Sequence, residues 1–287
     1  MGEPLIPLDN WTNASMPLTL RYHARTSVPV EIEGVIPERI RDKPLAEIER
    51  LEVFHGNRKL PLAEIFSVNG DPSDGRIDFE GDLSGVHFIG YGMTAGEIRV
   101  HGDAGRHVGG EMKGGLIVVE GNAGDWVGGE MHGGLIRVTG NAGHLIGAAY
   151  RGSKRGMTDG TILIGGDVGS EVGAAMRRGL LAIGGGCGDA AGFGMIAGTI
   201  VVFGRSGIRI GAGMRRGTIA LLSADSPGLL HTFRKAGNFH PLFLSLLLRE
   251  LQRLGFASAR LELERELALY HGDLVAMGKG EVWMRAG

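Results

Sequence analysis

The sequence predicts a mainly β protein whose centre is a right-handed parallel β-helix of about seven 19-residue coils, with α+β capping segments at both ends. Glycine accounts for 52 of the 287 residues, well above the usual ~7%. A phrase that reads GDAGRHVGGEMKGG at 102–115 returns as GNAGDWVGGEMHGG at 121–134. A short apolar phrase typical of a strand follows each copy.

The repeat consists of six units, which begin at Glu97, Leu116, Leu135, Thr161, Leu180 and Thr199. Each unit has 19 residues except the third, which has 26, and a looser unit of 21 residues occupies 76–96. Each opens with a strand phrase such as EIRV or LIVV, with aliphatic residues at positions 2 and 4. That alternation points one face of the strand inward. The expected inward residues include Ile98, Val100, Ile117, Val119, Ile200 and Val202.

Two further positions are apolar in nearly every unit. Position 12 holds Val108, Val127, Ile146, Val172, Ala191 and Ile210, and position 16 holds Met112, Met131, Tyr150, Met176, Met195 and Met214. We expect both rows to be buried, because one unit cannot bury its apolar face alone whereas stacked units form a continuous core. Glycine recurs at positions 6, 9, 13 and 19, where the chain must turn sharply.

Two other interpretations of the glycines fit less well. A left-handed helix of hexapeptide repeats would have 18 residues per coil with six-residue echoes, which the sequence lacks. A dinucleotide-binding loop would be followed by a helix, but GFGMIAG (192–198) and GAGMRRG (211–217) are followed by further strand phrases.

Three parts of the chain follow from this pattern: an N-terminal capping segment at 1–75, the repeat at 76–225 and a C-terminal cap of helix and strand at 226–287. In the first we expect a strand pair formed by LTLRYHA and VPVEIEGVI, and a helix in PLAEIERLEVF. In the last we expect a helix over 241–254 and a hairpin over 270–284. Caps are required because the ends of stacked strands expose unpaired backbone groups.

Composition narrows the classes of function. The net charge of −2 gives no indication of nucleic-acid binding. The single cysteine excludes a disulfide framework and an all-cysteine metal site within the chain. The start MGEPLIPLDN lacks the features of a secretory signal, and the apolar run 241–254 is too short to span a bilayer. We therefore expect a cytoplasmic protein without membrane or nucleic-acid partners.

Residues with catalytic potential have structural interpretations that we favour. His87 and His107 share a row in our alignment of the units, but two ligands do not make a zinc site, and we expect no metal in this chain. Cys187 replaces small residues at position 8 and is expected to be a buried, inert thiol. Glu111 and Glu130 share position 15, a spacing that could suit a hydrolytic carboxylate pair, although surface glutamates are the better interpretation.

The most notable group of residues on the predicted exterior is a set of basic side chains. Positions 17 and 18 hold Lys113 and His132 in early units and Arg177, Arg178, Arg215 and Arg216 in later ones, and the insertion in the third unit adds Arg151, Lys154 and Arg155. Stacking would gather them into a ridge. A solvated edge, or a surface that meets an acidic partner, is one interpretation; capture of an anionic ligand by guanidinium groups is the other.

The segments LAEIFSVNGD (62–71) and FIGYGMTAGEIRVHGDAGRHVGGEMKGGLIVVEGNAG (88–124) resemble the C subunit of formylmethanofuran dehydrogenase. They also resemble its bacterial counterpart, the C subunit of the formyltransferase/hydrolase complex, which serves formaldehyde oxidation in methylotrophs. The shared repeat is the GXGXG domain that also ends the large subunit of glutamate synthase. The resemblance is close over about 60–225 and looser over 236–256 and 270–281.

The resemblance implies a β-helix subunit without catalytic residues of its own, packed against amidohydrolase-like, molybdoprotein-like and formyltransferase subunits. The reaction it implies moves a formyl group from formyl-tetrahydromethanopterin to a methanofuran-type carrier and releases formate. It also implies zinc in a partner subunit and no cofactor bound by this chain alone. The oligoglutamate tail of such a carrier is an anion that the basic ridge could bind.

Two alternatives stay open. The first is the C subunit of a molybdenum- or tungsten-dependent dehydrogenase, or a glutamate-synthase-type domain. The second, of another class, is a stand-alone β-helix enzyme acting on carbohydrate.

Overall fold

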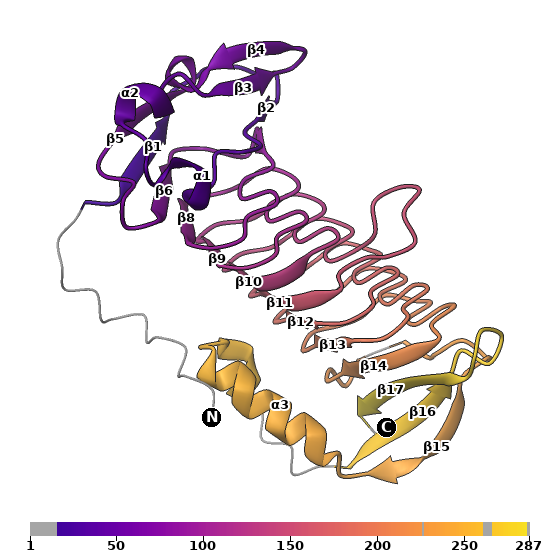
Figure 1. Ribbon diagram of the computed structural model, residues 1–287. Helices are drawn as coiled ribbons and strands as arrows, with labels where there is room; N and C mark the ends of the chain where they lie inside the picture. Colours follow the sequence, from indigo (N-terminus) through magenta and orange to yellow (C-terminus); the bar gives the residue numbers. More distant parts are fainter. Residues whose placement is uncertain (1–15, 226, 261–265, 286–287) are drawn as a thin grey trace.

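The computed structural model describes residues 16–225, 227–260 and 266–285, and Figure 1 shows an elongated molecule built along a row of short strands. Most strands belong to one 13-stranded sheet. From edge to edge its strands are β15 (Arg234–Phe239), β16 (Leu267–Gly272), β17 (Lys279–Arg285), β14 (Arg216–Leu221), β13 (Thr199–Val202), β12 (Leu180–Ile183), β11 (Asp159–Ile164), β10 (His132–Val138), β9 (Leu116–Val119), β8 (Glu97–His101), β6 (Arg76–Glu80), β1 (Leu18–Tyr22) and β5 (Phe66–Asn69).

The remaining elements are few and short. A four-stranded sheet has the order β4 (Arg58–Pro61), β3 (Glu52–His55), β2 (Val30–Glu31) and β7 (Val86–His87). The helices are α1 (Pro37–Ile40), α2 (Leu45–Ile48) and α3 (Leu242–Arg253), with 3-10 turns η1 (Leu62–Glu64) and η2 (Ala257–Arg260). None of the helices in the described part of the chain is both long and apolar enough to cross a membrane.

The mainly β content is as predicted, but the predicted right-handed parallel β-helix is wrong. The structure instead has a large, open, mixed sheet, parallel from β1 to β17 through the repeat and antiparallel where β5, β16 and β15 join it. Each repeat unit supplies one strand to this sheet, and the rest of the unit consists of turns. These turns join the next unit by one isolated bridge, as between Ala104 and Ala123, and by individual backbone hydrogen bonds, as from the N–H of Gly128 to the carbonyl of Val108. The glycines and residues with positive φ in those turns prevent further ladders from forming.

The predicted inward rows are buried. The strand residues stack in register, so that Ile98 pairs with Ile117 and Ile117 with Ile136. All six position-12 residues are at most 2% exposed, as are five of the position-16 residues, Met112, Met131, Met176, Met195 and Met214. One core runs through the repeat because each unit covers the apolar side chains of its neighbour.

The assignment of Tyr150 to the buried row at position 16 is wrong. Met157 takes that place in the third unit and is fully buried, whereas Tyr150 is half-buried. The seven extra residues of that unit therefore run from Tyr150 to Gly156 and leave the stack before the methionine row resumes.

Glycine at position 13 meets both a conformational and a steric requirement. Gly109 has a φ of 63°, a left-handed value that side chains disfavour. A Cβ there would lie 2.4 Å from Cδ1 of Ile136 on β10. The glycines of this row thus let the turns close over the aliphatic residues of the sheet.

The structure confirms some of the elements expected at the two ends of the chain and contradicts others. The strand pair expected from LTLRYHA and VPVEIEGVI is wrong, because β1 and β2 belong to different sheets. The helix expected in PLAEIERLEVF shrinks to the four residues of α2, since the chain enters β3 at Glu52. The helix over 241–254 is confirmed as α3, and the final hairpin as β16 and β17.

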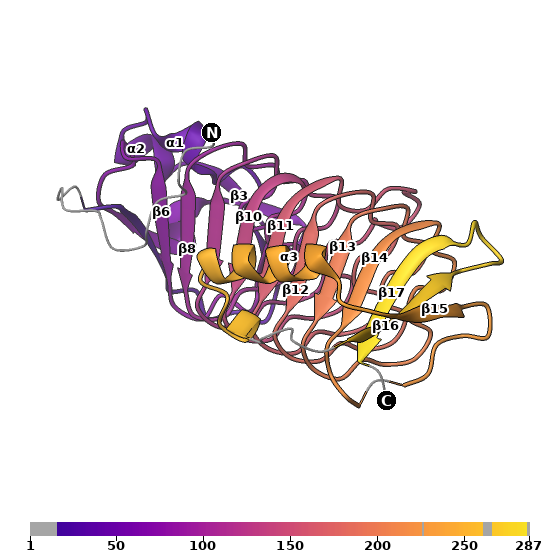
Figure 2. The ribbon, with the colours of Figure 1, turned by 90° about the horizontal axis from the view of Figure 1, so that it is seen from below.

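Helix α3 covers part of the outer face of the large sheet. Figure 2 shows it lying across the strands of the repeat. Its residues Leu244, Leu248 and Leu251 pack in a second core with outward residues of the strands, among them Leu163 and Val201. The opposite side of the helix leaves large apolar side chains in solvent: Leu242 is 74% and Leu246 56% exposed.

Candidate functional site

The insertion carries the first group of predicted basic residues. Arg151, Lys154 and Arg155 are exposed on a loop that projects beyond the neighbouring turns (Figure 1). We call residues 151–155 the cationic finger. Its three charges lie on a convex part of the surface.

The second group consists of two arginine pairs, Arg177–Arg178 and Arg215–Arg216, and all four residues are exposed. The backbone N–H of Arg177 donates to the carbonyl of Met157 at 2.8 Å, so the first pair lies at the base of the finger. Arg216 is paired in register with Lys279 of β17, which adds a basic residue that the repeat pattern could not reveal.

The ridge is not one continuous row. Thr158 lies between His132 and Arg177, because its N–H donates to the carbonyl of Met131 while that of Arg177 donates to Met157. Ile196 separates Arg177 from Arg215 in the same way, so these two arginines are about 10 Å apart, or two strand spacings. Among the described residues, the seven predicted site cations form no ion pair.

The expectation that His87 and His107 share a row is wrong. The N–H of Phe88 donates to the carbonyl of Arg106, and the N–H of His107 donates to that of Asp125, so Phe88 is the neighbour of His107. Burial, with the charge of Arg106, lowers the pKa of His87 and lowers that of His107 to about 4. Within the described residues, no group of three His, Cys, Asp or Glu is placed to hold a metal ion.

Glu111 and Glu130 do share a position in adjacent units, but each is engaged by a neighbour. The Tyr91 hydroxyl donates to Glu111 at 2.5 Å, and the N–H of Tyr150 donates to Glu130 at 2.9 Å. Burial and the bond to Glu111 raise the pKa of the Tyr91 hydroxyl. These contacts favour a structural role over a hydrolytic pair.

An aromatic row beside these carboxylates was missed in the sequence. The rings of Phe88 and His107 stack at 4.5 Å between centroids, and those of His107 and Trp126 at 5.4 Å. Aligned by their backbone hydrogen bonds, all three occupy position 11, where the repeat imposes a left-handed φ even on Leu145. Aligning the leading unit one residue later would have predicted this stack.

Cys187 is 7% exposed and lies in the row of small residues at position 8. Burial raises the pKa of its thiol to about 11. The predicted burial of this thiol is confirmed. Because the thiolate is the reactive form, we expect the cysteine to be inert at neutral pH.

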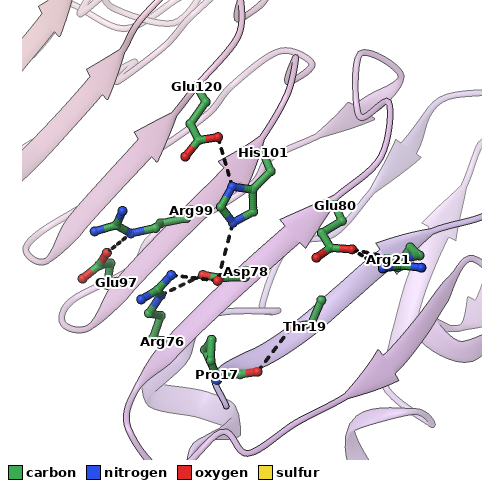
Figure 3. A network of polar contacts seen from close by, with 10 residues as sticks. All are labelled: Pro17, Thr19, Arg21, Arg76, Asp78, Glu80, Glu97, Arg99, His101 and Glu120. Carbon is green, nitrogen blue, oxygen red and sulfur yellow. Dashed lines mark hydrogen bonds and ion pairs between the residues drawn. The ribbon is translucent and has the colours of Figure 1, made fainter. Parts of the chain in front are cut away.

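A charged network occupies the part of the sheet's outer face that α3 leaves open, on β6 and β8 and directly after β9 (Figures 2 and 3). Arg76 binds both carboxylate oxygens of Asp78 at 2.8 Å. His101 lies 3.5 Å from Asp78 and 3.0 Å from Glu120. Burial lowers the pKa of His101, but its contacts with Glu120 and Asp78 outweigh burial and raise it. The alternation in RIDFE and EIRVH could have predicted these outward residues.

Comparison with known proteins identifies the family. No protein-family model matches the chain. Over 92 residues it is 40% identical to the C subunit of the tungsten-containing formylmethanofuran dehydrogenase 2 of Methanococcus maripaludis, a match that covers 32% of this chain and 34% of the relative. Over 83 residues it is 42% identical to the C subunit of the molybdenum-containing formylmethanofuran dehydrogenase 1 of Methanothermobacter thermautotrophicus, which covers 29% of this chain and 21% of the relative.

The structural match is far longer. A chain in the crystal structure of the formyltransferase/hydrolase complex (FhcABCD) from Methylorubrum extorquens, in complex with methylofuran, is 35% identical. The superposition has a TM-score of 0.87 and covers 94% of this chain and 100% of that one. With this coverage, and with the names of the curated relatives, the protein belongs to the family of formylmethanofuran dehydrogenase C subunits.

Proposed function

We propose that this protein is a non-catalytic subunit of a multi-subunit one-carbon enzyme, namely a formyltransferase/hydrolase complex. In that assembly a formyl group moves from formyl-tetrahydromethanopterin to a methanofuran-type carrier, and formate is then released. The observation that carries the proposal is the match, over the full length of the other chain, to a chain of such a complex. The curated relatives supply the identity of the subunit but are spanned for about a third of their length or less.

The chain's part in this proposal is to hold its partners together. Those partners are amidohydrolase-like, molybdoprotein-like and formyltransferase subunits, and the assembly is cytoplasmic. Zinc belongs to a partner subunit, and this chain alone binds no cofactor. A long rigid stack of units suits the role because it presents an extended surface whose geometry hardly changes on binding.

The basic side chains are the proposed contacts for an anion. Arg177, Arg178, Arg215 and Arg216 are exposed and without ion pairs in the described ranges. Guanidinium groups bind carboxylates in bidentate fashion. The acidic tail of a methanofuran-type carrier, or the acidic surface of a partner, would satisfy them, and the same holds for Arg151, Lys154 and Arg155.

Affinity purification of the tagged, full-length chain from its own cells tests the proposal. We expect it to co-purify with the three partner types, with zinc, and with formyl transfer and formate release in the complex. The chain purified alone should show neither activity. Turnover by the isolated chain, or recovery of the chain without these partners, would contradict the proposal.

A second candidate is the C subunit of a formylmethanofuran dehydrogenase, which the names of the curated relatives favour. The same purification separates the two. Tungsten or molybdenum in the complex, together with formylmethanofuran oxidation, would indicate the dehydrogenase, and zinc without either metal would indicate the hydrolytic complex.

A further inference from the structure

The insertion begins with Tyr150, whose ring lies in a slot and packs against two glycines. A Cβ on Gly110 would be 2.4 Å from the Tyr150 hydroxyl oxygen, and one on Gly129 would be 2.9 Å from Cζ of the same ring. Both glycines occupy position 14 of their units and neither has a positive φ. The other units carry side chains at this position: Ala148, Ala174, Phe193 and Ala212. Space for the Tyr150 ring, and not backbone conformation, therefore accounts for Gly129. At Gly110 the ring of Tyr91 needs space as well, because its Cδ2 would lie 2.9 Å from the added Cβ.

The slot holds the ring by shape. Its walls include His107 and Trp126, whose ring centroids lie 5.5 and 6.3 Å from that of Tyr150. The N–H of Tyr150 donates to Glu130. Within the described residues the hydroxyl of Tyr150 is buried without a hydrogen-bond partner. Packing of the ring, and not a bond from its hydroxyl, thus anchors the start of the insertion.

The cationic finger is fixed at both ends. At its start the N–H of Ser153 donates to the carbonyl of Tyr150 at 2.9 Å. At its end the N–H of Gly156 donates to Ala175 at 3.0 Å, and that of Met157 donates to Gly147 at 2.9 Å. The backbone of the loop between these points, which carries the three cations, is therefore held in place before any partner binds.

We propose that this Tyr150-anchored cationic finger is a docking element that inserts into an acidic recess on a partner subunit. The inference rests on the proposed function, in which the chain works inside a complex. Small-molecule sites are concave, whereas the finger is convex, so a macromolecule is the fitting partner. Its three cations are fewer than the roughly six to ten phosphate contacts typical of nucleic-acid binding, which favours an acidic protein surface.

Trypsin tests the anchor in the purified full-length chain, since Arg151, Lys154 and Arg155 are all cleavage sites. Tyr150→Ala should speed cleavage at the finger about 10-fold or more, because local cleavage follows the population of the opened loop. Gly129→Ala should do the same by filling the slot. Tyr150→Phe should behave like the parent, since the hydroxyl has no partner. Gly85→Ala is the matched control, because a Cβ there meets nothing within 4 Å.

Binding of the purified chain to a subcomplex of the three partner types, lacking this subunit, tests the docking. The triple reversal Arg151→Glu, Lys154→Glu, Arg155→Glu should weaken binding about 10-fold or more and reduce its salt dependence. The charge-conserving triple Arg151→Lys, Lys154→Arg, Arg155→Lys should bind within about twofold of the parent.

Each outcome has a separate meaning. Equal binding by the reversed triple and the parent would overturn the docking proposal while leaving the proposed function intact. Failure of the parent chain to bind the subcomplex would overturn both. Tight, finger-dependent binding to a 20-base-pair DNA duplex, with no effect of reversal on the subcomplex, would replace the acidic protein partner by nucleic acid.

Discussion

Replacing Met131 by aspartate should prevent the protein from folding stably. Met131 is fully buried, and its Cε packs against the start of β11, 2.8 Å from where a Cβ on Gly160 would lie. Removing the methionine side chain from a core costs about 2–5 kcal/mol. Burying a carboxyl group without a partner adds about 2–7 kcal/mol. The sum is comparable with the entire stability of a typical domain, about 5–15 kcal/mol.

Urea unfolding followed by circular dichroism and by tryptophan fluorescence measures the effect, and Trp126 of the same repeat unit is one of the reporters. The control is Met131→Leu, which nearly conserves volume and should cost less than about 1.5 kcal/mol. If the aspartate variant unfolded within about 1 kcal/mol of the parent, the methionine row could not be the packed centre of the repeat.

Three further predictions concern titration, reactivity and charge. His101→Gln should cost more stability at about pH 5.5 than at about pH 8.5. The reason is that the pKa of His101 is raised in the folded protein. Its stabilising contribution is therefore complete below the unfolded pKa of about 6.5 and is lost as the pH rises through the folded pKa. Equal losses would contradict this. Cys187 should resist a thiol reagent at about pH 8 in the native chain and react fully in urea, since burial raises its pKa to about 11; fast native labelling would refute the burial argument. Arg178→Glu with Arg216→Glu should raise KM of the assembled complex for an acidic carrier and flatten its salt dependence, each contact contributing about 0–1 kcal/mol, with kcat for a tail-less carrier unchanged. An unaltered KM across a salt series would leave these arginines as a solvated edge, and loss of assembly would indicate an interface with a partner.

The repeat was predictable because nearly every unit has the same length and carries apolar residues at the same inward positions. Alternation in phrases such as LIVV specifies a strand with one buried face, and the structure has a strand there each time. The rest of each unit has no second alternating phrase in the sequence, and in the structure many of its glycines and a few other residues adopt a positive φ. The step from a period of 19 to a β-helix therefore assumed ladders in the turns, where the structure has isolated bridges and individual backbone hydrogen bonds instead.

The candidate site was predictable in composition but not in arrangement. Counting positions placed Tyr150 in the methionine row, because nothing in the local sequence tells where an insertion leaves the stack. Met157 restores the row seven residues later, and only the packing of the ring on Gly110 and Gly129 shows where Tyr150 goes. A clue did exist in the sequence: position 14 is glycine in just the two units that precede the insertion.

The outward side chains of the strands, and not the sequence of the helix, determine where α3 lies on the sheet. Outward residues are small or apolar on β11 to β14, where Leu163, Ala182, Val201 and Ala220 pack against the helix. Toward β8 and β6 the outward residues become charged and form the charged network (Figure 3). The Arg137 side chain of β10 stands at this boundary and donates to the carbonyl of Leu254, directly after α3. Charged outward side chains lose hydration when an apolar helix covers them, so α3 does not extend over the charged network, and a partner that covered the network would have to offer polar groups.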